Sequence, residues 1–155
     1  MTKYDIFLQI AKELNEKLGI SPLLFGSLGL GQRLGMDLSP DDIDILVPKH
    51  FLHENWRHLV DIMSGLGFEL YDLHEHAFRR DASAAFAEFE SLTDFAGVDI
   101  SKIPAVNDRD INFFLLGLED YLKVYRASSK DSYRRNKNNG KDFHKIELIE
   151  KNLRE

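Results

Sequence analysis

Cysteine is absent from the 155-residue chain, which excludes disulfide bonds and zinc sites built on thiolates. Long apolar runs are absent too, because no stretch approaches the ~18 uncharged apolar residues that a membrane-spanning helix needs. The first residues lack the apolar core of a signal peptide and carry charged side chains such as Asp5 and Lys12. A hydrophobic fraction of 43% and a charged fraction of 30% are ordinary globular values. We therefore expect a single folded, cytoplasmic domain over residues 1–155, with no membrane contact.

Positive charge is scarce as well, and the net charge of −6 argues against a dedicated binder of duplex DNA. The exception is residues 121–155, which hold 10 Lys or Arg against 5 Asp or Glu. Such a basic segment either folds back over an acidic site or forms a helix with a solvated basic face. The sequence leaves both interpretations open.

Apolar residues recur at helical spacing in four segments that we expect to be helices: 2–18, 50–66, 118–136 and 141–153. Short apolar runs between turn residues predict five strands: 22–25, 42–47, 68–73, 77–80 and 84–92. The order of these elements, with no linker between them, predicts an α+β fold. In this fold a mixed sheet carries helices mainly on one face, and the C-terminal helices, about 118–153, pack on the core.

Two carboxylates alternate with isoleucines at the start of one predicted strand. Asp42 and Asp44 stand at i and i+2, so their side chains point to the same face, about 6.7 Å apart along the strand. Ile43 and Ile45 then point into the core. Like charges this close need neutralisation, and Mg²⁺, as one ion or as two, takes carboxylate and phosphate oxygens. The alternative is a strand edge with solvated charges.

Gly26 and Ser27 follow the short apolar strand 22–25. If a helix begins there, the glycine lets a phosphate approach the backbone, while free N–H groups and the serine hydroxyl bind it. This segment would then hold a triphosphate, and the metal at Asp42 and Asp44 would bridge it. Taken alone, the pair is also compatible with an ordinary turn.

A third carboxylate is usual in such a site, as a metal ligand or as a base. In the strand 85–90 we expect Ala85, Ala87 and Phe89 to pack on the core, which places Glu88 and Glu90 together on the other face. We favour Glu88 narrowly over Glu90; a polar strand face is the alternative for both.

Several other polar residues have weaker claims to the site. The basic residues of the C-terminal segment either neutralise phosphate charge or form a solvated helix face: Arg134, Arg135, Lys137 and Lys141. His74 and His76 flank Glu75 at strand spacing, but lone surface histidines are commoner than metal ligands.

Residues 25–27 (Phe-Gly-Ser) and 42–45 (Asp-Ile-Asp-Ile) resemble the signature of the polymerase-β-like nucleotidyltransferase superfamily. The C-terminal segment also looks like that of its small bacterial members, in which Arg or Lys precedes Lys-Asp, here Lys141-Asp142. The resemblance implies a nucleotidyltransferase fold and a Mg²⁺-dependent enzyme. Such an enzyme transfers a nucleoside monophosphate from a nucleoside triphosphate such as ATP to an acceptor, often a hydroxyl.

Two alternatives to this activity remain. Fourteen residues separate Ser27 from Asp42, and no motif fixes the third carboxylate, so the chain can also be a catalytically silent module of the same fold. Such a module would bind a nucleotide or a small protein partner, as in a toxin–antitoxin pair, or form a homodimer. The basic C-terminal helices could instead serve an RNA-binding adaptor.

Overall fold

The structure is a computed structural model that describes residues 1–130 and 141–155, with the backbone alone at Lys141. The chain divides into two compact units. Unit 1 comprises Met1–Phe89 and Pro104–Leu115, and unit 2 comprises Glu90–Ile103 and Leu116–Glu155. The expectation that the C-terminal helices pack on the core of a single domain stays a prediction.

Unit 1 contains a mixed seven-stranded sheet in the order β3-β4-β5-β2-β1-β7-β6. Two neighbouring pairs are parallel, β2 with β5 and β1 with β7, and the other pairs are antiparallel. The strands are β1 Leu23–Phe25, β2 Ile43–Val47, β3 Glu69–Asp72, β4 Ala77–Arg79, β5 Ser83–Glu88, β6 Ala105–Asp108 and β7 Ile111–Phe114. Two parallel pairs within a largely antiparallel sheet confirm the predicted mixed sheet.

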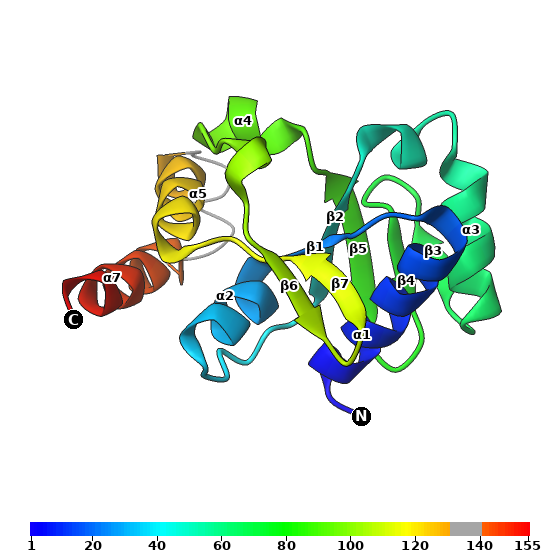
Figure 1. Cartoon of the computed structure of the whole chain (residues 1–155), viewed down its shortest axis with the longest axis horizontal. Helices are drawn as coiled ribbons and strands as arrows, with labels where there is room; N and C mark the ends of the chain where they lie inside the picture. The colour runs from blue at the N-terminus through cyan, green and yellow to red at the C-terminus, as the bar shows by residue number, and fades with distance from the viewer. Residues whose placement is uncertain (131–140) are drawn as a thin grey trace. The chain divides into compact units, whose positions relative to one another are not determined.

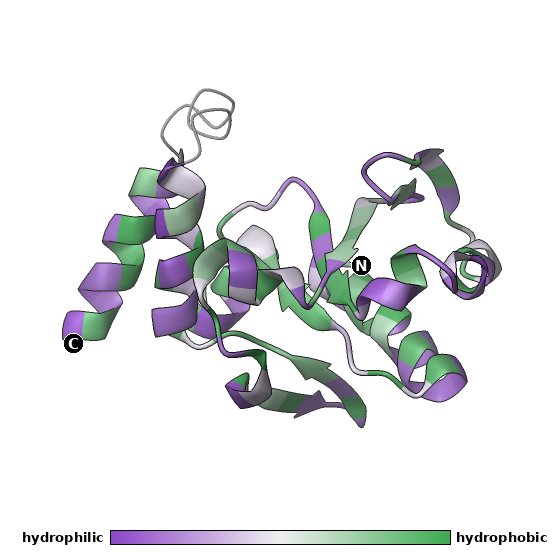
Figure 2. Cartoon of the chain, turned by 90° about the horizontal axis from the view of Figure 1, so that it is seen from above, coloured by the Kyte–Doolittle hydropathy of each residue, from purple (hydrophilic) through white to green (hydrophobic). Residues whose placement is uncertain are grey.

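The helices of unit 1 bury an apolar stripe against the sheet. Helix α1 (Lys3–Glu13) starts with a capping box formed by Thr2 and Asp5, and a π-helical stretch, η1 (Leu14–Leu18), continues it. Ile43 and Ile45 of β2 are fully buried in one core with residues of α1 and α3. Figure 1 shows α1 and α3 beside the strands. In Figure 2 the apolar colouring is concentrated along the central strands. The other helices of unit 1 are α2 Gly26–Leu34, η2 Lys49–Leu52 and α3 Trp56–Gly65.

Unit 2 is helical in its described residues. Among the contacts that join α5 to α7, the Ser128 hydroxyl donates to Asp142 Oδ2 at 2.7 Å, Arg126 lies 3.6 Å from Glu150, and Lys145 lies 5.2 Å from the ring centre of Tyr125. Among the helices that the structure describes, none has both the length and the apolar composition to cross a membrane. The elements of unit 2 are α4 Ser91–Ala96, η3 Ile100–Lys102, α5 Leu118–Lys130 and α7 Lys141–Arg154.

Two predicted boundaries are wrong. The helix predicted over 50–66 is instead a 3₁₀ turn, η2, followed by α3 from Trp56, because Asn55 turns back to bond His50 through both backbone and side chain. The strand predicted over 84–92 ends at Glu88, and α4 begins at Ser91. Strands β6 and β7 were not predicted.

Candidate functional site

The two aspartates lie at the start of β2, as the alternation predicted. Asp44 is the second residue of the strand and is half-buried, while Asp42 immediately precedes the strand and is exposed. Ile43 and Ile45 have no exposed surface. The strand is therefore divided, with one face packed against helices and the other carrying carboxylates.

Gly26 lies directly against the carboxylate of Asp44. Strand β1 pairs antiparallel with β2 so that Phe25 lies opposite Asp44, and the chain turns into α2 at the next residue. Gly26 has a φ of 64°, in the left-handed region that favours glycine. A Cβ at Gly26 would lie 3.2 Å from Cγ of Asp44 and closer still to Oδ2. Both the backbone conformation and the space beside Asp44 therefore require glycine here.

The N-terminus of α2 offers donors at the same place. Phe25, the N-cap residue, gives no side-chain hydrogen bond to the first turn. The N–H groups of a first helical turn have no partners within the helix, and they carry a partial positive charge. Ser27 adds a hydroxyl in that turn. The first turn of α2, with its backbone donors and Ser27, thus begins beside Asp44, and Asp42 lies two residues earlier in the chain. Donors and carboxylates in this arrangement suit a metal-bound phosphate group.

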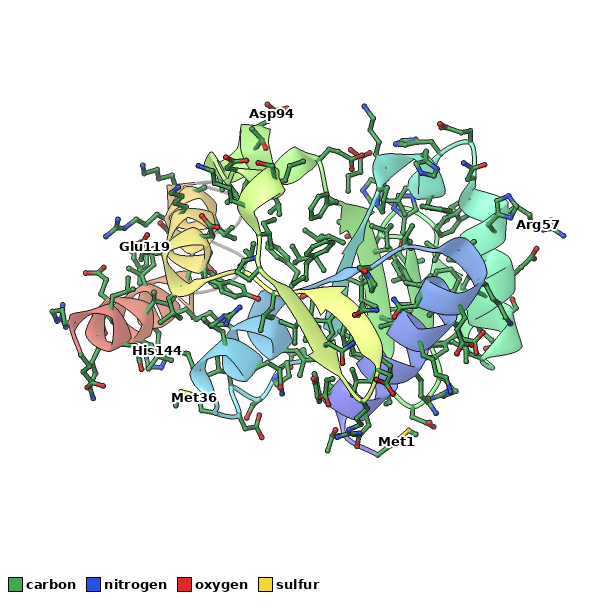
Figure 3. The ribbon with its side chains drawn as sticks, viewed as in Figure 1. Met1, Met36, Arg57, Asp94, Glu119 and His144 are labelled. Carbon is green, nitrogen blue, oxygen red and sulfur yellow. The ribbon has the colours of Figure 1, made fainter. Side chains whose placement is uncertain are left out.

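A cavity of about 750 Å³ extends from Ser27 along α2. Its walls come from the first residues of α1, one side of α2, the loop 35–40 and Arg109. Met36, labelled in Figure 3, is part of that loop. Tyr4 donates to Asp108 Oδ2 at 2.6 Å, and Arg109 lies 3.5 Å from Asp5, so these polar groups of the wall are held in place. Asp42 and Asp44 are not among the lining residues.

The face predicted for Glu88 is wrong. Strands β2 and β5 run parallel, with Ile45 opposite Phe86, Asp44 opposite Ala85 and Val47 opposite Glu88. Residues directly opposite each other share a face, so Glu88 lies on the face of the buried isoleucines. Ala85 is the residue on β5 that lies beside Asp44.

Glu88 is engaged with histidines on that other face. Its Oε1 lies 2.7 Å from Nε2 of His53, which precedes α3. His76 is nearby, with its ring 5.0 Å from that of Trp56 and φ of 50°. Burial lowers the pKa of His76, the nearby His53 lowers it further, and Glu88 opposes this shift. Glu88 is thus part of a small His–Glu cluster rather than a neighbour of Asp44.

The remaining predicted residues lie elsewhere. Glu90 was predicted to lie in the same strand as Glu88, but it is the N-cap residue of α4 in unit 2. Arg134, Arg135 and Lys137 are outside the described residues. Lys141 begins α7, and its side chain is outside the described part of the chain. The described residues also hold no group of three His, Cys, Asp or Glu side chains that could bind a metal ion, which excludes His74 and His76 as members of one.

The donor set nevertheless fits Mg²⁺ bound with a nucleotide. Mg²⁺ is commonly held by one or two carboxylates, with phosphate oxygens and water completing its shell. Asp42 and Asp44 would supply the carboxylates, and the first turn of α2, which begins beside Asp44, would supply donors to a phosphate. A third carboxylate is not needed for this arrangement.

Sequence reasoning missed one group on the Asp44 face. Arg79 of β4 lies opposite Ser83 of β5, and its guanidinium lies 5.1 Å from the ring centre of Tyr71. The Tyr71 and Ser83 hydroxyls are 2.7 Å apart and share a hydrogen bond. No motif indicates this group, because strand register alone brings its members onto the aspartate face.

Comparisons with known proteins agree with this fold. No family model matches the chain. YnaI of Bacillus subtilis (strain 168), an uncharacterized protein, is 43% identical over 155 residues, with 99% of each chain covered. The crystal structure of an antigenic nucleotidyltransferase-like protein from Paracoccidioides brasiliensis is 16% identical with a TM-score of 0.63, over 95% of this chain and 74% of that one. The crystal structure of ANT(2″)-Ia in complex with adenylyl-2″-tobramycin is 14% identical with a TM-score of 0.58, over 98% and 90% respectively. These likenesses confirm the predicted α+β fold.

Proposed function

We propose nucleotidyl transfer as the activity of this chain, which belongs to the family of the Bacillus subtilis protein YnaI and has the nucleotidyltransferase fold. One observation carries the proposal: the backbone of Gly26 lies against the carboxylate of Asp44, at the start of a helix. This contact joins the phosphate-binding half of the site to its metal-binding half. The fold by itself would be compatible with many activities.

Each residue of the site has a defined task in this proposal. The N–H groups of the first turn of α2 and the Ser27 hydroxyl bind the β- and γ-phosphates of a nucleoside triphosphate. Asp42 and Asp44 hold Mg²⁺. When bound, this ion neutralises charge on the phosphates, which favours attack at phosphorus. Gly26, which has no side chain, lets the start of α2 lie directly beside the Asp44 carboxylate.

The reaction is an in-line displacement at the α-phosphorus. An acceptor oxygen forms a new bond to that phosphorus, the bond from phosphorus to the bridging oxygen breaks, and pyrophosphate leaves. The contribution of the protein is mainly positioning and electrostatic stabilisation, as in other phosphoryl transfers. ATP is the donor that we propose, because the similar structure of ANT(2″)-Ia is a complex with adenylyl-2″-tobramycin, which carries an adenylyl group.

A silent module of the same fold is the second candidate. The alanine beside Asp44 and the engagement of Glu88 with His53 favour it, because both remove the carboxylate expected to complete a catalytic site. Such a protein would bind nucleotide and Mg²⁺ without turnover, or bind a small protein partner.

Calorimetric titration of the four common nucleoside triphosphates with Mg²⁺ tests the proposal. Wild type is compared with an Asp42→Ala/Asp44→Ala double variant, whose folding is checked by circular dichroism. Binding that requires both the metal and the carboxylates supports the site. Absence of binding at millimolar nucleotide to the folded protein contradicts nucleotidyl transfer and directs the search to protein partners.

A further inference from the structure

Strand β5 places no group beside Asp44 that could remove a proton from an acceptor. Ala85 lies opposite Asp44, and Ala87, two residues further along β5, is on the same face. Glu88 is on the opposite face with His53. A general base must come within about 3.2 Å of the proton that it removes, or act through one water. The side chains of β5 therefore offer no base on this face.

Because β5 offers no base beside Asp44, this strand favours acceptors that need none. A hydroxyl must lose its proton when it attacks phosphorus, so it needs a base or a second metal ion. A phosphate monoester needs neither, because its second pKa is about 6 and its oxygens are already anionic at pH 7. Only its negative charge must be neutralised as it approaches the triphosphate.

Arg79 supplies a positive charge on the same face. Ser83 lies one residue before Ala84, the partner of Ile43, so Ser83 and the opposite Arg79 are level with Asp42. Two strand spacings, about 10 Å in all, separate β4 from β2. Arg79 is exposed, and no bulky side chain of β5 lies on this face between it and Asp44.

The guanidinium of Arg79 is also held in place. It lies over the ring of Tyr71, whose hydroxyl shares a hydrogen bond with that of Ser83. An arginine stacked on an aromatic ring can still bind a phosphate through two parallel hydrogen bonds, although here Glu69 of β3 lies opposite Arg79 on the same face. Strand register and the ring contact thus place a cationic group on the face of Asp44, two strands away from β2.

We propose that the acceptor of this protein is a phosphate monoester that Arg79 binds. This inference rests on the proposed nucleotidyl transfer and names its acceptor class. An anionic oxygen of the monoester forms a bond to the α-phosphorus, the bond to the bridging oxygen breaks, and pyrophosphate leaves. No proton is transferred, and the product contains a new phosphate–phosphate linkage.

Binding of inorganic phosphate is the first test. The protein is loaded with a non-hydrolysable α,β-methylene nucleotide and Mg²⁺, and loading is verified by calorimetry before phosphate is titrated. We expect saturable phosphate binding that weakens at least tenfold in Arg79→Gln. Arg57→Gln is the matched control, because Arg57 is an exposed arginine on α3 that pairs with Asp61 and points away from the strands (Figure 3). No saturable phosphate binding by the loaded wild type, or equal binding by Arg79→Gln, overturns the inference.

The number of metal ions bound per chain tests separately whether the alanine at position 85 removes a metal ligand from the site. With nucleotide present, we expect one Mn²⁺ per wild-type chain in an electron paramagnetic resonance titration and two in Ala85→Asp. Ala87→Asp, on the same face but further along β5, should retain one. Two ions in wild type would overturn the inference while leaving nucleotidyl transfer intact. Failure of the nucleotide to load in the first place would count against the proposed function itself.

Discussion

Gly26 and Asp44 meet in the structure so closely that no side chain fits between them. A methyl group on Gly26 would lie 3.2 Å from the carboxyl carbon of Asp44. Gly26 begins α2 and Asp44 lies in β2, so the contact ties a helix N-terminus to a metal-binding strand. The position of the carboxylate therefore depends on a residue that has no side chain.

Substitution of Gly26 by alanine should damage both stability and nucleotide binding. A non-glycine residue at a left-handed φ costs roughly 1–2 kcal/mol. The added methyl group must also displace the carboxylate of Asp44, so we expect at least a tenfold loss of affinity for Mg²⁺–nucleotide. Urea unfolding and calorimetry measure the two effects.

Gly19→Ala separates these two causes. Gly19 has φ of 65°, but a methyl group on it would meet no neighbour within 4 Å. The variant should therefore lose similar stability while keeping its nucleotide affinity. Equal nucleotide affinities of Gly26→Ala and Gly19→Ala would show that the contact with Asp44 is unimportant.

Asp42→Asn should abolish metal-dependent turnover without unfolding the protein. Asp42 is exposed, and surface substitutions usually change stability by less than about 0.5 kcal/mol. Loss of its charge removes a metal ligand, so pyrophosphate release from nucleoside triphosphates should stop. Asp41→Asn, an exposed neighbour outside the strand, is the control and should keep wild-type turnover. An unaffected rate in Asp42→Asn would contradict the proposed site.

Glu88→Gln should leave the affinity for Mg²⁺–nucleotide unchanged, because Glu88 lies on the face opposite Asp44. Its bond to the half-exposed His53 is a surface contact, so we expect a stability loss of no more than about 1 kcal/mol. A tenfold fall in nucleotide affinity would mean that Glu88 reaches the metal after all. Parallel titrations of wild type and variant decide between these outcomes.

His76 should make the protein less stable in mild acid. Its pKa lies below the ordinary value of 6.5, chiefly through burial, so the unfolded chain binds the proton more readily than the folded one. The stabilising contribution is thus fully present above pH 7 and is lost as the pH falls from about 6.5 through the lower folded value. His76→Asn, which tolerates a positive φ, should lose less stability between pH 7.5 and 5.5. Parallel losses in unfolding experiments at the two pH values would exclude this role.

Tyr4 should make the protein less stable in alkali. Burial raises the pKa of Tyr4 above 10, and the hydrogen bond to Asp108 raises it further. The folded state therefore keeps the proton that the unfolded chain releases, and the free energy of unfolding falls as the pH rises above 10. Tyr4→Phe should remove this dependence and cost about 1.5 kcal/mol at pH 7, since the acceptor is charged. A Tyr4→Phe variant as stable as wild type at pH 7 would contradict the hydrogen bond.

The aspartate strand could be predicted from sequence because its alternation is unambiguous. Asp and Ile differ so strongly in hydration that residues 42–45 fit a strand in one orientation only. Strand β5 lacks such a signal, since residues 84–87 are all apolar and three of them are alanines. Its face is fixed by long-range packing, with the ring of Phe86 5.8 Å from that of Phe78 on β4.

Two further features depended on partners distant in sequence. Strand β6 alternates exposed and half-buried residues at a sheet edge and exists through its pairing with β7. The Arg79 group depends on the register between β4 and β5, which no local pattern contains. Local chemistry thus indicated the carboxylates and the glycine, whereas the residues around them required the assembled sheet.

The parallel pairing of β1 with β7 has a consequence for synthesis of the chain. Leu23 pairs with Phe114, so β1 leaves the ribosome long before β7, which is its second neighbour in the sheet besides β2. At about 5–20 residues per second, β1 remains an open edge for several seconds. Leu23 and Leu24 are fully buried in the finished molecule, and an apolar open edge invites pairing with other chains. The nascent chain, rather than the folded protein, is therefore the form of this molecule most exposed to aggregation.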